Sequence, residues 1–324
     1  MGRRGGMIAL ACVALAACVN DSSGAPGDGG SDAPADANAP PDAAPDASDG
    51  GTSAACDPAK QFGVLAALSS TINDVARVGW AQLTHDELAM TYAAFDGGAG
   101  PINLFTATRA SASDPFTTGT RLALSGTNDD DTPSIAGDNL TLYFSSNRPN
   151  KSAAFHLWAA TRTVTSTDFG SPLEVSSLAS SASEYEPYVS ADGTVLYFAS
   201  NRSGGAGKND LYRATRPTNG SFTLDSPGPF TTVNTADDES DPVYSPDELT
   251  LYFASDRAGG HGNTDVWKAT RPDTTSPFGA PVNVTELNGA SDDAPSWISD
   301  DGCRIYVTRG ASGNYAIYTA TKPK

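Results

Sequence analysis

Carboxylates in short acidic motifs are the residues of this 324-residue chain that are best suited to chemistry. The motifs read NDDD before Thr132, SEYEP before Tyr188, DDESDP before Val243 and SDDAP before Ser296. Grouped carboxylates can bind a cation, attract a basic partner, or act as a paired acid and base. With three residues from glycine-rich loops, the candidate binding face comprises Asp130, Asp131, Glu184, Glu186, Asp210, Glu239, Asp241, His261, Asp265, Asp292 and Asp293.

A second interpretation of these acids is local, because Asp and Glu in turns often accept hydrogen bonds from nearby backbone N–H groups. Asp210 and Asp265 each follow an arginine, Arg202 and Arg257, at a fixed spacing. That spacing predicts a salt bridge or a backbone-bracing role, with a ligand-facing acid as the alternative. Ca²⁺ is the one candidate cofactor, and the metal ligands stay unassigned.

The formal net charge of −18 argues against a nucleic-acid partner, whose phosphates need Lys and Arg, and favours a cationic one. Signatures of catalysis are missing. His85, His156 and His261 lie in different parts of the sequence without a metal-binding spacing, and no G-x-S-x-G motif is present.

Five similar segments position the acidic motifs. The tripeptide ATR ends at Arg109, Arg162, Arg216 and Arg271, and ATK ends at Lys322, with intervals of 51 to 55 residues. Before it come a β-rich run such as LTLYFAS, a loop with Gly, Asn or Asp, and a run such as DVWKATR. A short run with a tight turn precedes these, and a Phe-led run follows, which gives four strands, a to d, in each repeat. Repeats of this length and content predict an all-β, five-bladed β-propeller.

The last repeat lacks strand d, and the N-terminal segment supplies it. Phe62-Gly63 aligns with Phe278-Gly279, so the N-terminal strand is expected to complete the last blade and close the ring. Cys56 precedes that strand, and Cys303 follows the a–b turn of the same blade. We therefore predict a Cys56–Cys303 disulfide, with two separate buried thiols as the alternative.

The N-terminus has a basic start and a short apolar run that is too short to span a bilayer, which is typical of a secretion signal. The motif LAAC, which ends at Cys18, resembles the lipobox of bacterial lipoproteins, and this resemblance implies lipidation of Cys18. Residues 18–55 after the 1–17 signal are rich in Asp, Ala, Pro and Gly and predict a disordered tether. Val19 after the cysteine favours the outer membrane, and residues 56–324 form the propeller.

The repeat pattern P-x-x-S-x-D-G, L-Y-F-x-S-x-R and D-[LV]-[WY] resembles the WD40-like PD40 repeat of TolB-like periplasmic proteins. One repeat matches at Pro187, Ser190, Asp192, Gly193, Leu196 to Phe198, Arg202, Asp210 and Tyr212. The next matches at Pro242, Ser245, Asp247, Leu251 to Phe253, Arg257, Asp265 and Trp267. The resemblance implies the propeller fold. Five blades in place of six, and the lipidation motif, mean that a role in Tol translocation is not carried over.

The function expected from these features is non-catalytic: a monomeric, lipid-anchored, extracytoplasmic binding or scaffold domain for an envelope protein or glycan, with a cationic partner favoured by the acidic face. The alternative is a glycan-active hydrolase or lyase, which needs two carboxylates inside the channel. We expect the acids in the turns that flank the inner strands and not inside the channel, and this placement disfavours the hydrolase or lyase without excluding it. The aromatic residues Trp80, Tyr188, Tyr244 and Trp297 lie on or near the channel and either stack on a ligand or pack between blades.

Overall fold

A computed structural model describes residues 56–74, 77–95, 100–149, 154–218, 220–226, 228–311 and 313–324. The predictions for the signal peptide (1–17), for lipidation of Cys18 and for the tether (18–55) lie outside these residues.

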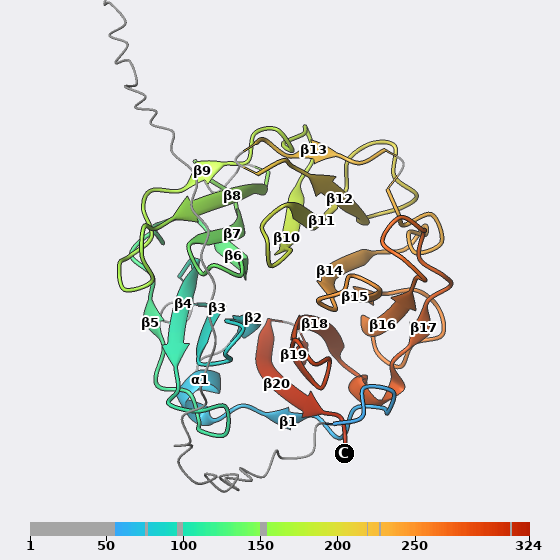
Figure 1. Ribbon diagram of the computed structural model, residues 1–324, viewed down its shortest axis with the longest axis horizontal. Coiled ribbons are helices and arrows are strands. Elements are labelled where there is room, and N and C mark those ends of the chain that lie inside the picture. Colours follow the sequence, from blue (N-terminus) through green and yellow to red (C-terminus); the bar gives the residue numbers. More distant parts are fainter. Residues whose placement is uncertain are drawn as a thin grey trace, which may run out of the picture. The chain divides into compact units, whose positions relative to one another are not determined.

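The described residues form five four-stranded antiparallel sheets arranged in a ring, which confirms the five-bladed β-propeller (Figure 1). The inner strands, a, are β2 (Val78–Leu83), β6 (Asp130–Ile135), β10 (Glu184–Val189), β14 (Glu239–Tyr244) and β18 (Asp292–Ile298). The second strands, b, are β3 (Ala89–Phe95), β7 (Thr141–Ser146), β11 (Val195–Ser200), β15 (Thr250–Ser255) and β19 (Arg304–Ala311). The third strands, c, are β4 (Ile102–Thr108), β8 (His156–Thr161), β12 (Asp210–Thr215), β16 (Asp265–Thr270) and β20 (Asn314–Thr321). The outer strands, d, are β5 (Thr120–Arg121), β9 (Leu173–Glu174), β13 (Thr223–Leu224), β17 (Val282–Asn283) and β1 (Ala66–Ala67).

Two short helical segments complete the described elements, α1 (Ser70–Asn73) and the 3-10 helix Thr285–Leu287. The core lies between neighbouring blades, because the second strands are buried on both faces. Tyr143 and Leu157 of the second blade pack with Leu196 and Phe198 of the third, and the Leu-Tyr-Phe motif places one large side chain against each neighbour.

The ring closes through the N-terminal segment, as the alignment of Phe62 with Phe278 predicted. The outer strand β1 pairs with β20, so the last blade contains both ends of the described chain. Cys56 and Cys303 form the predicted disulfide, with a Cα–Cα distance of 6.0 Å across 247 residues of sequence. Such a link restricts the unfolded chain and stabilises the fold by about 3–5 kcal/mol.

The ATR arginine fastens each blade to its own a–b turn. Its Nε donates to a backbone carbonyl of that turn, as Arg271 does to Glu248 at 2.8 Å and Arg216 to Gly193 at 2.7 Å. Its guanidinium lies over the Phe that leads strand d, 4.6 Å from the Phe278 ring in the case of Arg271. Lys322 repeats the contact with the aromatic ring in the last blade, where its Nζ lies 4.8 Å over Phe62. The tripeptide that revealed the repeat is therefore a packing motif.

Candidate functional site

Four acids of the predicted binding face are part of the blade architecture. Each occupies a fully buried position near the start of an inner strand and forms an ion pair with an arginine at or just after the end of the second strand. These latch acids and their partners are Asp130 with Arg148 (2.7 Å), Glu184 with Arg202 (3.1 Å), Glu239 with Arg257 (2.9 Å) and Asp293 with Arg309.

Each of these arginines also connects two blades. Arg257 donates to the carbonyl of Val233 at 2.6 Å, in the loop that leads to β14, and lies 4.9 Å over the Phe253 ring. Arg202 donates to Leu178 at 2.8 Å in the same way. A buried carboxylate with a hydrogen-bonded guanidinium is electrically satisfied, so the latch acids have little capacity for a ligand.

Arg202 and Arg257 therefore pair with the latch acids, and of the two roles predicted for Asp210 and Asp265, a salt bridge or backbone bracing, the structure shows backbone bracing. Asp210 instead accepts hydrogen bonds from the backbone N–H groups of Ala206 (2.9 Å) and Gly207 (3.3 Å). Asp265 does the same in the next blade with His261 (2.8 Å) and Gly262 (3.3 Å).

The predicted backbone-bracing role of Asp210 and Asp265 is thus confirmed, and it explains the neighbouring glycines. A Cβ on Gly205 would lie 1.9 Å from Asp210 Oδ2, and one on Gly260 would lie 1.7 Å from Asp265 Oδ2. The glycine-rich stretch is thus a hairpin folded closely around a buried carboxylate. His261 itself is exposed at the tip of its loop.

Glu186 and Asp241, which we call the channel pair, have a different environment. Each follows a latch acid by two residues, yet both lie within the inner strands β10 and β14. The expectation that the acids sit in flanking turns is therefore wrong. The error arises because each inner strand begins before its proline, and a register irregularity follows Tyr185 and Ser240.

Backbone geometry sets the direction of the channel pair. Glu186 has φ of 56° and Asp241 has φ of 49°, in the left-handed region that non-glycine residues rarely adopt. Trp80 and Thr132 occupy the same position in β2 and β6 with φ of 55° and 49°. The recurrence of this unfavourable geometry in four blades marks the position as one that the fold keeps for the channel.

The channel pair lines a narrow cavity at the ring axis together with Trp80, Thr132 and Pro295. The backbone N–H of Asp241 donates to Glu186 Oε2 at 3.0 Å, and Trp80 Nε1 donates to Asp241 Oδ1 at 2.9 Å. Among the described residues, no Lys, Arg or His forms an ion pair with either carboxylate. The cavity of about 20 Å³ has room for one water-sized group.

Burial and mutual repulsion change the acidity of this group. Burial raises the pKa of Asp241 from 3.8 to about 7. Burial also raises the pKa of Glu186 well above its usual value, and the adjacent Asp241 carboxylate adds to the rise. Asp131, which lies 3.7 Å from Arg77, has a pKa raised by burial to about 6. Paired carboxyls that resist ionisation in a cleft are typical of functional sites.

A second cavity, of about 80 Å³, is lined by the five a–b turns and by aromatic side chains. Tyr188 donates from its hydroxyl to the Tyr244 carbonyl at 3.1 Å, and the Tyr197 and Tyr244 rings stack at 3.6 Å. Trp297 completes the apolar wall, and it is itself buried in the core. The aromatic residues singled out in the sequence pack against neighbouring side chains and line the two cavities, while stacking on a ligand stays a prediction.

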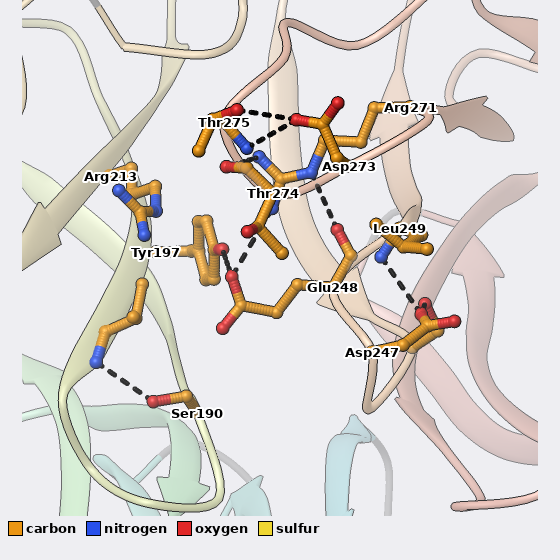
Figure 2. A network of polar contacts seen from close by, with 12 residues as sticks. Ser190, Tyr197, Arg213, Asp247, Glu248, Leu249, Arg271, Asp273, Thr274 and Thr275 are labelled. Atoms are coloured by element: carbon orange, nitrogen blue, oxygen red, sulfur yellow. Dashed lines mark hydrogen bonds and ion pairs between the residues drawn. The ribbon is translucent and has the colours of Figure 1, made fainter.

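Glu248 lines this second cavity, and Figure 2 shows the polar contacts that fix its side chain. It accepts hydrogen bonds from the Tyr197 hydroxyl of the neighbouring blade and from Arg271 Nη2 at 3.4 Å. Neither Glu248 nor Tyr197 was identified from the sequence. A signal was present, because Glu248 stands at the turn position where the preceding repeat has Gly193. In the structure both residues have a positive φ, 57° and 70°.

The remaining candidates are dispersed. Asp292 accepts a hydrogen bond from the Tyr315 hydroxyl at 3.1 Å, and His85 Nδ1 lies 2.7 Å from Asp300 Oδ2 on the rim of the second cavity. No set of three or more His, Cys, Asp or Glu among the described residues has a metal-binding arrangement, so Ca²⁺ binding stays an untested prediction. In the part of the chain that the structure describes, no helix is long and apolar enough to span a bilayer.

The described residues form a five-bladed β-propeller, and several solved structures are similar to it in fold. A thermostable family-43 glycoside hydrolase is 12% identical, with a TM-score of 0.53 over 78% of this chain and 91% of that one. TolB from Acinetobacter baumannii is 14% identical, with a TM-score of 0.49 over 76% of this chain. The matched part is 55% of that TolB chain, so this protein spans little more than half of it. A putative TolB from Agrobacterium tumefaciens is 14% identical, with a TM-score of 0.46 over 77% and 91% of the two chains.

In sequence, no model of a known family and no curated protein matches the chain. At identities this low, the structural likeness concerns the fold alone. The function has to be argued from the channel and from the residues that line it.

Proposed function

We propose that this protein is a non-catalytic binding domain of the bacterial cell envelope that holds a cationic group of an envelope protein or glycan in its central channel. The disulfide fits an oxidising, extracytoplasmic compartment. The lipobox-like motif at Cys18 supports a lipid anchor, and Val19 supports the outer membrane. A monomeric propeller on a 38-residue tether, residues 18–55, would reach partners away from the membrane surface.

The channel pair is the observation on which this proposal depends. Glu186 and Asp241 are adjacent carboxyls without a cationic partner among the described residues, whereas the latch acids two residues earlier have one. An ammonium or guanidinium group would supply the missing charge and lower the pKa of both carboxyls. Ser296 Oγ, which lines the same cavity, is buried without a hydrogen-bond partner in the described chain and adds a polar contact.

Calorimetric titration of the full chain tests the proposal with two cationic probes, a short and a long lysine oligomer, because their ammonium groups stand at the ends of flexible side chains. Oligomers with Nε-acetylated lysine serve as the neutral control. We expect the cationic probes to bind with release of protons, because binding ionises the channel pair. Glu186→Gln combined with Asp241→Asn should remove both effects. Asp237→Asn, a matched acid in the loop before β14, should leave them intact. Equal binding by the double variant, or no binding by the wild type, contradicts the proposal.

The second candidate is a glycan-active hydrolase or lyase on the same channel. Two carboxyls with raised pKa favour it, and the family-43 likeness shows that this fold can carry hydrolysis. The cavity of about 20 Å³ at the channel pair opposes it, since a sugar ring cannot enter a space for one water. We expect no release of reducing ends from polysaccharides or peptidoglycan. Turnover that disappears in Glu186→Gln would establish the hydrolase.

A further inference from the structure

Lysine is rare in this chain and unevenly placed. Only six lysines occur among 324 residues, against 38 acids. Three of them, Lys60, Lys268 and Lys322, line one groove of about 250 Å³ on the outer side of the closure between the fourth and fifth blades. A concentration of half the lysines at one groove, on a protein with net charge −18, needs an explanation beyond solubility.

Two of the three lysines have local partners. Lys322 Nζ donates to the Pro58 carbonyl at 2.7 Å while it lies over Phe62, and Lys60 Nζ donates to the carboxylate of the last residue, Lys324. The Lys322 contact leaves its ammonium charge without a carboxylate, whereas Lys60 has one. Both contacts hold the ammonium groups at the groove wall in fixed positions.

Lys268 has no such partner. It is half-buried on β16, and it forms no hydrogen bond or ion pair with another described residue. Burial lowers the pKa of Lys322, and the like charge of Lys268 lowers it further. Glu286 is the one acid on the groove wall, and it accepts a hydrogen bond from the backbone N–H of Phe62 at 3.3 Å. Three ammonium groups against two carboxylates, Glu286 and that of Lys324, leave an excess of one positive charge in the groove.

We propose that this groove binds a phosphate-bearing group, with Lys268 as its main contact and Lys60 and Lys322 as flanking charges. Ammonium groups bind phosphate as point charges, and a phosphate monoester carries close to two negative charges at neutral pH. The group can belong to a lipid headgroup or to a soluble phosphate ester. A headgroup would place the groove against a membrane that the acidic remainder of the surface avoids.

The test compares two probes on the full chain with Cys18→Ser, so that no lipid anchor holds it to vesicles. One probe is inorganic phosphate, followed by calorimetry. The other is a set of vesicles with and without phosphatidylglycerol, followed by sedimentation. Lys268→Gln should weaken binding at least tenfold. Lys208→Gln, which removes a lysine paired with Asp256 elsewhere, should leave it unchanged. Binding should also fall as salt rises.

The two probes also distinguish the two possible origins of the phosphate group, a lipid headgroup and a soluble ester. Binding to phosphatidylglycerol vesicles alone identifies a headgroup site, and binding to phosphate alone identifies a site for a soluble ester. Absence of binding to both probes, or equal binding by Lys268→Gln, overturns the proposal. The channel variant Glu186→Gln with Asp241→Asn should retain phosphate binding, so this outcome is independent of the function proposed for the channel.

Discussion

Two pairs of acids on the same two strands behave in opposite ways. Glu184 and Glu239 are buried against Arg202 and Arg257, whereas Glu186 and Asp241, two residues later, face the ring axis without an arginine. Both pairs consist of carboxylic acids, but the first pair is fully buried and the second is partly exposed. The difference comes from the backbone, because the left-handed turn at the second acid of each strand directs it toward the channel.

The comparison teaches that charge count is a poor guide to binding capacity in this fold. A carboxylate that has a guanidinium partner stabilises the blade, and removing either partner is costly. A carboxylate without one resists ionisation and keeps capacity for a cation. Of the eleven residues predicted as a binding face, the channel pair best meets the second description.

The largest expected effect comes from breaking a latch. Glu239→Gln should lower the free energy of unfolding by about 3–5 kcal/mol, because it leaves the Arg257 guanidinium, with a side chain 11% exposed, without its counter-charge. Urea denaturation of the full chain measures this loss. If Glu239→Gln and Asp241→Asn lower the free energy of unfolding by the same amount, the distinction between latch and channel acids is wrong.

A smaller effect of opposite sign is expected in the channel. The pKa of Asp241 is raised from 3.8 to about 7 in the fold, so the native state binds more protons than the unfolded state between these values. Stability should therefore fall as pH rises from about 4 to about 7. Asp241→Asn should flatten this decline and be more stable than the wild type at pH 8, by about 1–2 kcal/mol. Urea denaturation from pH 4 to pH 8 measures the free energy of unfolding of both proteins. A wild-type free energy of unfolding that rises with pH contradicts the expectation.

The smallest effect concerns the indole that contacts the channel pair. Trp80→Phe removes the N–H that donates to Asp241 at 2.9 Å, a contact that lowers the pKa of that carboxyl. We expect a further rise in the pKa of Asp241 and a loss of about 1 kcal/mol at pH 8. Trp297→Phe, which changes an indole outside the cavity of the channel pair, is the control for lost aromatic volume. An identical pH profile in both variants would separate Trp80 from the channel chemistry.

The blade architecture was predictable because it repeats. Five ATR or ATK tripeptides fixed the period, and the match of Phe62 to Phe278 predicted the closing strand and the disulfide between Cys56 and Cys303. Local sequence was enough here, since each blade uses the same contacts in the same order.

The site was less predictable, because partners across strands are set by register and not by spacing. Arg257 precedes Asp265 by eight residues, yet it pairs with Glu239, which is 18 residues away in the neighbouring strand. The inward direction of Asp241 depends on a single backbone torsion, which no residue pattern in the strand reveals. The acids could be named from the sequence, but their separation into latch and channel groups required the structure.

Direct titration of the two channel carboxyls tests the central claim most closely. Carbon-13 NMR of the full chain, with side-chain carboxyls labelled and assigned through Glu186→Gln and Asp241→Asn, reports their pKa values. The account predicts a midpoint near 7 for Asp241, an elevated value for Glu186, and a fall in both on addition of a cationic probe. Titration of both carboxyls near pH 4, unchanged by such a probe, would contradict it.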